Sequence, residues 1–411
     1  MKKNTKKKIV IISAILIINI IVTVITTKIV NNMSIGNKNY ESESGNSNST
    51  LIAKYIQKGI TLGGITGTLE TLDTYDATAT PEDISWGKTA YVKGVKITGT
   101  KRETVTGDET TNTTIHDEYG NAIIIPAGFK VVNPEANVED GIVIEDAMKG
   151  SQFVWVPVGE VKTNNGETKT ITLGRYTFDS NGKEQLKQSA ENWNLYTSID
   201  INGYSYKELS SSNYDNTIAK NLQDFITKTL SSGGYYIGRY EAGDVTAITD
   251  ERTDDTSDGH QVVCKEGVYP YNYVLQPQAA TLAREMYSST NFESDLINSY
   301  AWDTAIVFIQ TFSGDSNYSI QVGKNTTNNL QRTGENTLAN VDSGNNPVDV
   351  RCNIYDMAGN VDEWTTETAD PTNHSVRRGG NYSGTNTSSR AYHFTSLGSN
   401  RTEGFRTILY L

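Results

Sequence analysis

An uncharged run near the N-terminus constrains this chain more than any other feature. Residues 9–27, IVIISAILIINIIVTVITT, contain no charged side chain, and five lysines precede them in the first eight positions. A helix of that length spans roughly 28 Å, about the thickness of the hydrocarbon core of a bilayer. Lysines next to such a segment stay on the cytoplasmic side. The sequence therefore predicts a single-pass membrane anchor over residues 1–28, with the bulk of the chain extracellular.

Two segments of simple composition follow the anchor. No small-residue cleavage site ends the apolar run, which favours a retained signal anchor over a cleaved signal peptide. Residues 29–50 are small and polar without periodicity, which predicts a flexible linker. Residues 51–101 contain the similar pieces GGITGT and VKITGT and alternate short strands with glycine turns. We expect a small β-hairpin spacer module there.

Composition and periodicity define the class of the remaining chain. The 36 basic and 48 acidic residues give a net charge of −12, which argues against a nucleic-acid partner. The 35 glycines and 23 tyrosines favour strands and loops over a helical bundle. Apolar periodicity predicts helices only over residues 276–290 and 299–312. We therefore predict an irregular, loop-rich α+β domain over residues 117–411.

The two cysteines leave two alternatives open. Cys264 and Cys352 both lie in the part of the chain that is expected outside the cell. An oxidising compartment permits a disulfide between them, and their separation in sequence does not distinguish a disulfide from two buried thiols. Two cysteines are too few for a structural zinc site.

The segment NIYDMAGNVDEW, residues 353–364, concentrates polar groups beside a tryptophan. Gly359 and Asn360 tolerate positive φ, so the backbone can turn sharply there. Asp356, Glu363 and backbone carbonyls could supply oxygen ligands, while Trp364 suits a hydrophobic core. The segment is either a polar turn held by a core tryptophan or a metal-binding loop.

Four C-terminal pieces occur in a familiar order: NIYDMAGNVDEWTTE, VRRGGNYSG, SSRAYHF and EGFRTILYL. They resemble the formylglycine-generating enzyme, or sulfatase-modifying factor, family, whose signature runs N-hydrophobic-x-G-N-V-W-E-W, R-G-G-S-W, R and G-F-R. The upstream pieces FVWVPVGE, YYIGRYEAGD and AWDTAIVFI are similar to the family's earlier motifs. The resemblance covers residues 120–411 and implies a C-type-lectin-like fold that is rich in loops.

The resemblance implies a structural calcium site in the 353–364 segment. In the family, this loop binds Ca²⁺ through an Asn or Asp side chain, two backbone carbonyls and a Glu. The corresponding residues here are Asp356, Gly359, Val361 and Glu363. Calcium takes six to eight oxygen ligands from irregular loops of this kind. Asp362 stands where the family has tryptophan, which adds a carboxylate and removes an apolar group.

The catalytic signature of the family is incomplete in this chain. The oxidising members hold copper with two cysteines after R-G-G, and those positions are Gly384 and Ser389 here. Neither side chain supplies the thiolate that cuprous copper requires. Cys264 and Cys352 lie elsewhere in the sequence, and the histidines show no metal or catalytic spacing. We expect no copper cofactor, and the balance favours a protein that is not an enzyme.

These features predict a membrane-anchored bacterial surface protein with a non-catalytic binding domain. The stretch 379–406 is rich in Tyr, Asn, Ser and Gly, the residue types of recognition surfaces, and its ligand would be a cell-surface glycan or a protein. Three alternatives stay open. The chain could be a divergent formylglycine-generating-type enzyme, a structural surface protein, or the variable target protein of a diversity-generating retroelement.

Overall fold

The computed structural model describes residues 53–70, 74–85, 88–101, 110–192, 198–201, 204–208, 222–254, 261–339, 348–370, 374–384, 386–389, 392–394 and 399–411. The predicted anchor and linker lie outside these residues. Within the described ranges, no helix is both long and apolar enough to cross a membrane. The chain divides into two compact parts, which fall within residues 1–77 with 92–95 and within residues 78–91 with 96–411.

Two small hairpins lie between residues 53 and 101. In the first, β1 (Thr61–Leu62) pairs with β2 (Ile65–Thr66) across a turn of two glycines. In the second, β3 (Thr89–Val92) pairs with β4 (Val95–Thr98), and the short helix η1 (Pro81–Asp83) precedes it.

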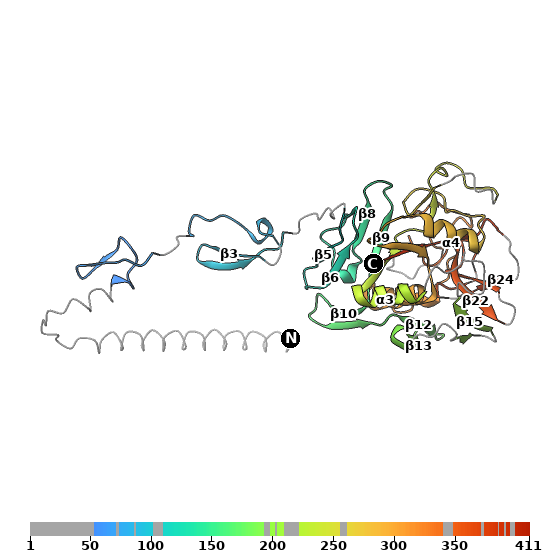
Figure 1. The fold of residues 1–411 in the computed structure, drawn as a ribbon, viewed down its shortest axis with the longest axis horizontal. Coiled ribbons are helices and arrows are strands. Elements are labelled where there is room, and N and C mark those ends of the chain that lie inside the picture. The colour runs from blue at the N-terminus through green and yellow to red at the C-terminus, as the bar shows by residue number, and fades with distance from the viewer. Residues whose placement is uncertain are drawn as a thin grey trace, which may run out of the picture. The chain divides into compact units, whose positions relative to one another are not determined.

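A six-stranded antiparallel sheet forms the centre of the large C-terminal part (Figure 1). Its strands in spatial order are β19 (Glu293–Leu296), β26 (Thr407–Tyr410), β16 (Gly234–Gly238), β9 (Gln152–Pro157), β8 (Val143–Asp146) and β7 (Phe129–Val131). The last strand of the chain therefore lies between two earlier strands, β19 and β16. This pairing carries the C-terminal G-F-R motif into the interior.

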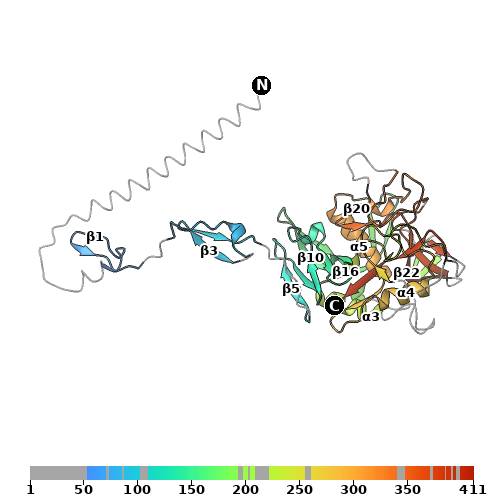
Figure 2. The same cartoon turned by 90° about the horizontal axis from the view of Figure 1, so that it is seen from above.

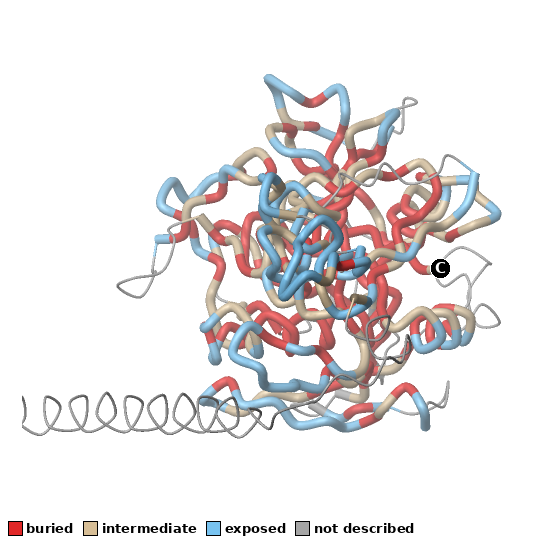
Figure 3. Tube along the Cα trace, turned by 90° about the vertical axis from the view of Figure 1, so that its left-hand side faces the viewer, coloured by how far each residue is buried: buried red, intermediate tan, exposed pale blue. Residues whose placement is uncertain are grey.

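Both faces of this sheet are covered by helices. Successive side chains of a strand point to opposite faces, and β9 contributes Phe153 and Trp155 to one core and Val154 and Val156 to another. The first core includes alanines of α4 (Gln276–Glu285), and the second includes apolar residues of α3 (Leu222–Ser232) and α5 (Ser299–Phe312). Figure 2 shows α3, α4 and α5 around the strands, and Figure 3 shows the buried residues in the interior.

A second sheet brings the C-terminal motifs together. Its strands run in the order β14 (Ile199–Ile201), β15 (Tyr204–Glu208), β22 (Asp362–Asp370), β23 (His374–Arg378) and β24 (Tyr392–Phe394), and β25 (Glu403–Phe405) pairs in parallel with β22. Glu363 therefore lies opposite Arg378 on one side and Gly404 on the other. Three motifs that are separate in sequence become neighbours in one sheet.

The other described elements are two-stranded pairs and single turns of helix. They are β5 (Thr113–His116) with β6 (Ala122–Ile125), β10 (Gly159–Lys162) with β11 (Thr168–Ile171), β12 (Gly174–Phe178) with β13 (Glu184–Ser189), β17 (Gly243–Asp244) with β18 (Val262–Val263), β20 (Val350–Arg351) with β21 (Ile354–Tyr355), η2 (Val138–Asp140), η3 (Ala190–Asn192) and η4 (Tyr318–Ile320). The fold is α+β, mostly sheet with few helices and many loops, as the sequence predicted.

The helices agree only in part with the sequence prediction. The helix expected over 299–312 has those bounds, and the Asn298 side chain caps it by accepting from the Ala301 amide at 2.9 Å. The helix expected over 276–290 ends at Glu285. Helix α3 was not predicted. Its amphipathic stretch is short, and its apolar face becomes recognisable only against β16 and β26.

Candidate functional site

The 353–364 segment joins β21 to β22 through a tight turn of left-handed residues. Asp356, Gly359 and Asn360 have φ of 56°, 113° and 57°. A Cβ on Gly359 would lie 2.3 Å from the backbone oxygen of Gly323, so only glycine allows these two backbones to approach each other. The positive φ expected at Gly359 and Asn360 is present. It serves a close contact with the 321–339 segment.

Trp364 anchors the segment in the core, as the sequence predicted. The side chain is 1% exposed, and its indole Nε1 donates a hydrogen bond to the Val274 carbonyl at 2.7 Å. It belongs to the same hydrophobic core as Phe405, which lies opposite it on the parallel strand β25. This buried anchor fixes the position at which the chain passes from the turn into β22.

Glu363 lies against a buried arginine. Arg406 donates from Nη2 to Oε1 of Glu363 at 2.6 Å and from Nε to Oε2 at 2.9 Å, and both side chains are fully buried. The remaining donors of Arg406 reach the carbonyls of Gly238 and Tyr355. Burial raises the pKa of Glu363, and the guanidinium of Arg406 opposes that rise. The arginine therefore already supplies a positive charge to this carboxylate.

Two more acidic side chains, Asp356 and Glu241, lie within electrostatic range of Arg406. Burial, together with the neighbouring carboxylate of Asp349, raises the pKa of Asp356 to about 8. Burial also raises the pKa of Glu241 well above its ordinary value. One guanidinium thus faces more buried carboxyl groups than it can neutralise, which favours the protonated form of the surplus ones.

The calcium site predicted at Asp356, Gly359, Val361 and Glu363 includes one carboxylate that already has a cationic partner. Both oxygens of Glu363 accept from Arg406. In the described part of the chain, no group of three or more His, Cys, Asp or Glu side chains is arranged to hold a metal ion. Calcium binding by these four residues stays a prediction, and it requires Glu363 to release Arg406.

The variant Asp356→Asn distinguishes two roles for Asp356, a buried protonated carboxyl group and a calcium ligand. Because the folded-state pKa of Asp356 is raised from 3.8 to about 8, its favourable contribution is complete below about pH 4 and is lost as the pH rises towards 8. Asp356→Asn removes the charge and keeps a residue that tolerates positive φ. We expect the variant to exceed the wild type in free energy of unfolding at pH 8. This advantage should shrink at pH 5.

Urea unfolding at the two pH values, with and without calcium, measures this effect. A tenfold change in a protonation equilibrium corresponds to about 1.4 kcal/mol, and we expect the pH-dependent difference to exceed that value. If Asp356 ligates calcium instead, Asp356→Asn should lose stability in calcium. The wild-type melting temperature should then fall on addition of a chelator.

Asn360 connects the turn to two surface loops. Its side-chain Oδ1 accepts from the Gln331 backbone amide at 3.0 Å, and its Nδ2 donates to Glu241 at 2.7 Å and to the Gln331 carbonyl at 3.1 Å. The Asn360 carbonyl accepts from the Tyr382 amide at 3.0 Å. One fully buried residue therefore holds both the 321–339 loop and the 379–389 loop.

The two loops also bind each other directly. The Asn325 amide donates to the Tyr382 carbonyl at 3.0 Å, and the Ser388 amide donates to the Gln321 carbonyl at 2.9 Å. Inside the first loop, the buried Asn325 side chain donates to the Asn329 carbonyl at 2.7 Å and to Asn336 at 2.9 Å. Polar side chains and backbone groups therefore join these loops, together with a small apolar cluster of Leu330, Val361 and Tyr382.

Several polar side chains outside this scaffold are exposed. They include Lys324, Thr326, Thr327, Asn328 and Asn329 in the first loop and Ser383 in the second. We call these six residues the polar rim. Short amide and hydroxyl side chains on a rigid base are typical of recognition surfaces, because they adapt their hydrogen bonds to a ligand.

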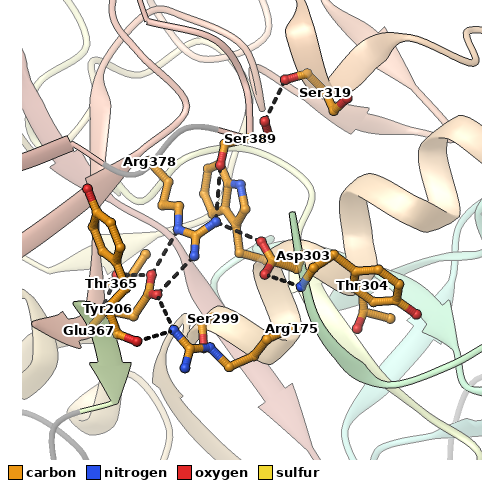
Figure 4. A network of polar contacts seen from close by, with 12 residues as sticks. Arg175, Tyr206, Ser299, Asp303, Thr304, Ser319, Thr365, Glu367, Arg378 and Ser389 are labelled. Carbon is orange, nitrogen blue, oxygen red and sulfur yellow. Dashed lines mark hydrogen bonds and ion pairs between the residues drawn. The ribbon is translucent and has the colours of Figure 1, made fainter. Parts of the chain in front are cut away.

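A buried ionic network contacts the second loop at Ser389 (Figure 4). Arg378 donates to both oxygens of Glu367, at 2.8 Å and 2.9 Å, and to Asp303 at 2.7 Å. Arg175 adds a contact to Glu367 at 3.2 Å. Arg378 also donates to the carbonyl of Ser389 at 3.1 Å, which ties the network to the loop.

Sequence reasoning did not identify Glu367 or Arg175. Asp303 carried one usable signal, because it is a carboxylate within the apolar helix AWDTAIVFI. A buried carboxylate requires a cation or hydrogen-bond donors. The partners come from distant parts of the chain, so their identity depends on the tertiary fold.

The positions of the family's copper cysteines have structural roles here. A Cβ on Gly384 would lie 2.5 Å from the Asn381 carbonyl oxygen. Ser389 is 3% exposed, and its hydroxyl donates to the Ser319 carbonyl at 2.6 Å. Cys264 and Cys352 are both free thiols. Burial raises the pKa of Cys264 to about 12, which disfavours its thiolate.

Comparison with known proteins gives little further information. No model of a known protein family matches the chain, and no curated protein matches it. Among solved structures, the chain is similar to Treponema denticola variable protein 1, with 10% sequence identity and a TM-score of 0.26. That match covers 63% of this chain and 96% of the other.

Proposed function

We propose that residues 117–411 form a non-catalytic ligand-binding domain of the sulfatase-modifying-factor type, with a C-type-lectin-like fold. The observation that carries this proposal is the polar rim. Its side chains are exposed, while the backbones beneath them are bound to each other and to the buried Asn360. Such preorganisation lowers the entropic cost of binding. The ligand class that suits a rim of amides, hydroxyls and one lysine is a glycan or a polar protein surface.

The chemistry of the second loop supports binding over catalysis. The site at which the family carries its copper thiolates offers a glycine and a buried serine, Gly384 and Ser389. Neither has a thiol, and Ser389 already donates its hydroxyl proton to a backbone carbonyl. The competing proposal of a divergent enzyme predicts oxygen uptake with a cysteine-containing peptide and copper. Absence of that uptake in the purified protein would remove it.

A sharper form of the proposal makes the chain a variable target protein of a diversity-generating retroelement. The support is that the Asn- and Ser-rich stretch 379–406 contributes one of the two loops that Asn360 holds. A neighbouring reverse-transcriptase gene with a near-copy of this stretch would support the assignment. Its absence would leave a binding domain of fixed sequence.

The proposed location is the outer face of a cell membrane, with anchorage through residues 9–27. The support is the lysine-flanked, uncharged run of the sequence. Protease added to intact cells should remove the domain. Digestion that occurs only after lysis would place the domain inside the cell and contradict the proposal.

Substitutions in the polar rim test ligand binding without disturbing the scaffold. We expect the combined variant Lys324→Ala, Thr326→Ala and Asn329→Ala to weaken a ligand found in a glycan and cell-wall screen by at least tenfold. These three side chains are exposed, so the free energy of unfolding should change by less than about 0.5 kcal/mol. Titration calorimetry with the full chain in detergent provides the measurement.

A matched control lies on β13. Gln185→Ala with Lys187→Ala also removes exposed polar side chains, but they lie outside the two loops. This control should bind as the wild type does. Equal binding by the rim variant and the wild type would place the ligand elsewhere on the molecule and would overturn the assignment of the rim.

A further inference from the structure

Residues 53–69 and 81–101 are two copies of one structural unit. Each unit has a turn, a hairpin and a returning segment that ends in I-T-G-T. Three backbone hydrogen bonds recur at equivalent places: Thr68 to Ala53 and Thr100 to Pro81, Leu69 to Ile56 and Lys101 to Ile84, and Gly67 to Ile60 and Gly99 to Lys88. The shared pieces of sequence therefore correspond to a shared fold.

The glycine of each I-T-G-T piece has the same structural role. A Cβ on Gly67 would lie 2.2 Å from the Ile56 carbonyl oxygen, and a Cβ on Gly99 would lie 2.2 Å from the Ile84 carbonyl oxygen. In both units the returning chain crosses directly over the backbone of the first turn. A larger residue at either position would break the crossing.

Neither unit forms a hydrophobic core from the residues that the structure describes. Among the described residues from 53 to 101, only Gly67 and Gly99 are buried. Large apolar side chains of both units are exposed: Tyr55 is 70% exposed, Leu62 61%, Tyr91 61% and Val95 62%. An isolated two-stranded hairpin is marginally stable at best in water. These units need an apolar surface to cover them.

We propose that the surface which covers these units is the same pair of units in a second copy of this chain. Repeated units of this size cannot bury their apolar faces alone, and they gain a core by stacking on like units, with about three needed for stability. One chain supplies two such units. A second copy supplies two more units of matching shape.

Charge favours a like partner over a strongly charged one. Residues 53–101 contain six lysines and five acidic residues, so the segment is nearly neutral, although the whole chain has a net charge of −12. A nearly neutral segment does not repel its own copy, and it offers little attraction to an acidic or basic partner. Apolar side chains on a neutral surface suit self-association.

The oligomeric state of the full chain in detergent tests the proposal. By light scattering after size exclusion, the wild type should be a dimer or larger. Leu62→Lys with Val95→Lys should convert it to a monomer, because two charges then replace exposed apolar contacts. Met148→Lys is the matched control, since Met148 is 93% exposed but lies in the large domain. This control should stay oligomeric.

Cysteine cross-linking gives an independent measurement. Under mild oxidation, Tyr91→Cys should form a disulfide-linked dimer, whereas Met148→Cys should not. A monomeric wild type would overturn the proposal. Oligomers that survive Leu62→Lys with Val95→Lys would also overturn it, because the association would then come from the anchor or the large domain. Ligand binding by the polar rim is independent of either result.

Discussion

Replacement of Arg406 by methionine should cost about 3–5 kcal/mol of unfolding free energy, the range typical of a broken buried ion pair. Arg406 is fully buried and satisfies both oxygens of Glu363. Its removal leaves Glu363 without a cation and weakens the electrostatic support of Asp356 and Glu241. Because small domains are stable by only about 5–15 kcal/mol, much of the stability of the fold depends on this one side chain.

Two comparison variants show whether the loss of stability comes from the burial of the ion pair or from ion pairing alone. Arg401→Met breaks a pair of similar geometry, since Arg401 contacts both oxygens of Glu251 at 2.6 Å, but its side chain is 33% exposed. We expect Arg401→Met to cost no more than about 1 kcal/mol. Adding Glu363→Gln to Arg406→Met should recover part of the loss, because the uncompensated charge is then gone.

Chemical unfolding of the full chain in detergent, followed by tryptophan fluorescence, measures these differences. Similar losses in Arg406→Met and Arg401→Met would mean that burial of Arg406 is not what makes its ion pair important. Restoration of the Arg406→Met variant by calcium would show that Glu363 can accept a metal ion once the guanidinium is absent. That result would support the calcium prediction in altered form.

The sequence predicted local features of the site well, because they depend on neighbouring residues. Gly359 and Asn360 were expected to adopt positive φ, and Trp364 was expected in the core. Each expectation follows from the conformational or hydrophobic preference of one residue type. The helix over 299–312 followed from apolar periodicity within a single segment. All of these features need little knowledge of the tertiary fold.

The pairing of charged groups could not be predicted in the same way. Glu363 was expected to face a cation, and the sequence resemblance suggested calcium. The cation that contacts it is Arg406, which parallel pairing of β22 with β25 brings beside it. Glu367 meets Arg175 although 192 positions separate them. Such partners are selected by strand order, and strand order is not encoded in local patterns.

The second large effect concerns Glu367, which bridges two buried arginines. Burial opposes the charge of Glu367, yet Arg378 and then Arg175 lower its pKa below the ordinary value. Glu367→Gln keeps the size of the side chain but removes the charge between the two guanidinium groups. Arg378 retains Asp303, whereas Arg175 loses its ion pair with Glu367. We expect a loss of about 3–5 kcal/mol at neutral pH.

The pH dependence of this loss identifies its electrostatic origin. A depressed folded-state pKa means that the contribution of Glu367 is present above the unfolded pKa and is lost as the pH falls through the folded value. The difference between Glu367→Gln and the wild type should therefore shrink under acid conditions. Glu167→Gln, in an ion pair with Lys169 whose side chains are 55% and 47% exposed, should change stability little at any pH.

The Glu367→Gln variant also links the core to the proposed binding surface. Arg378 donates to the carbonyl of Ser389, and Trp302 donates to the carbonyl of Ser388 at 3.0 Å, so the base of the second loop rests on this network. If the network positions the polar rim, Glu367→Gln should weaken ligand binding even where the protein stays folded, with amide exchange in 386–389 accelerated first. Unchanged exchange there, together with unchanged affinity, would restrict the network to a role in stability and leave Asn360 as the residue that positions the loops.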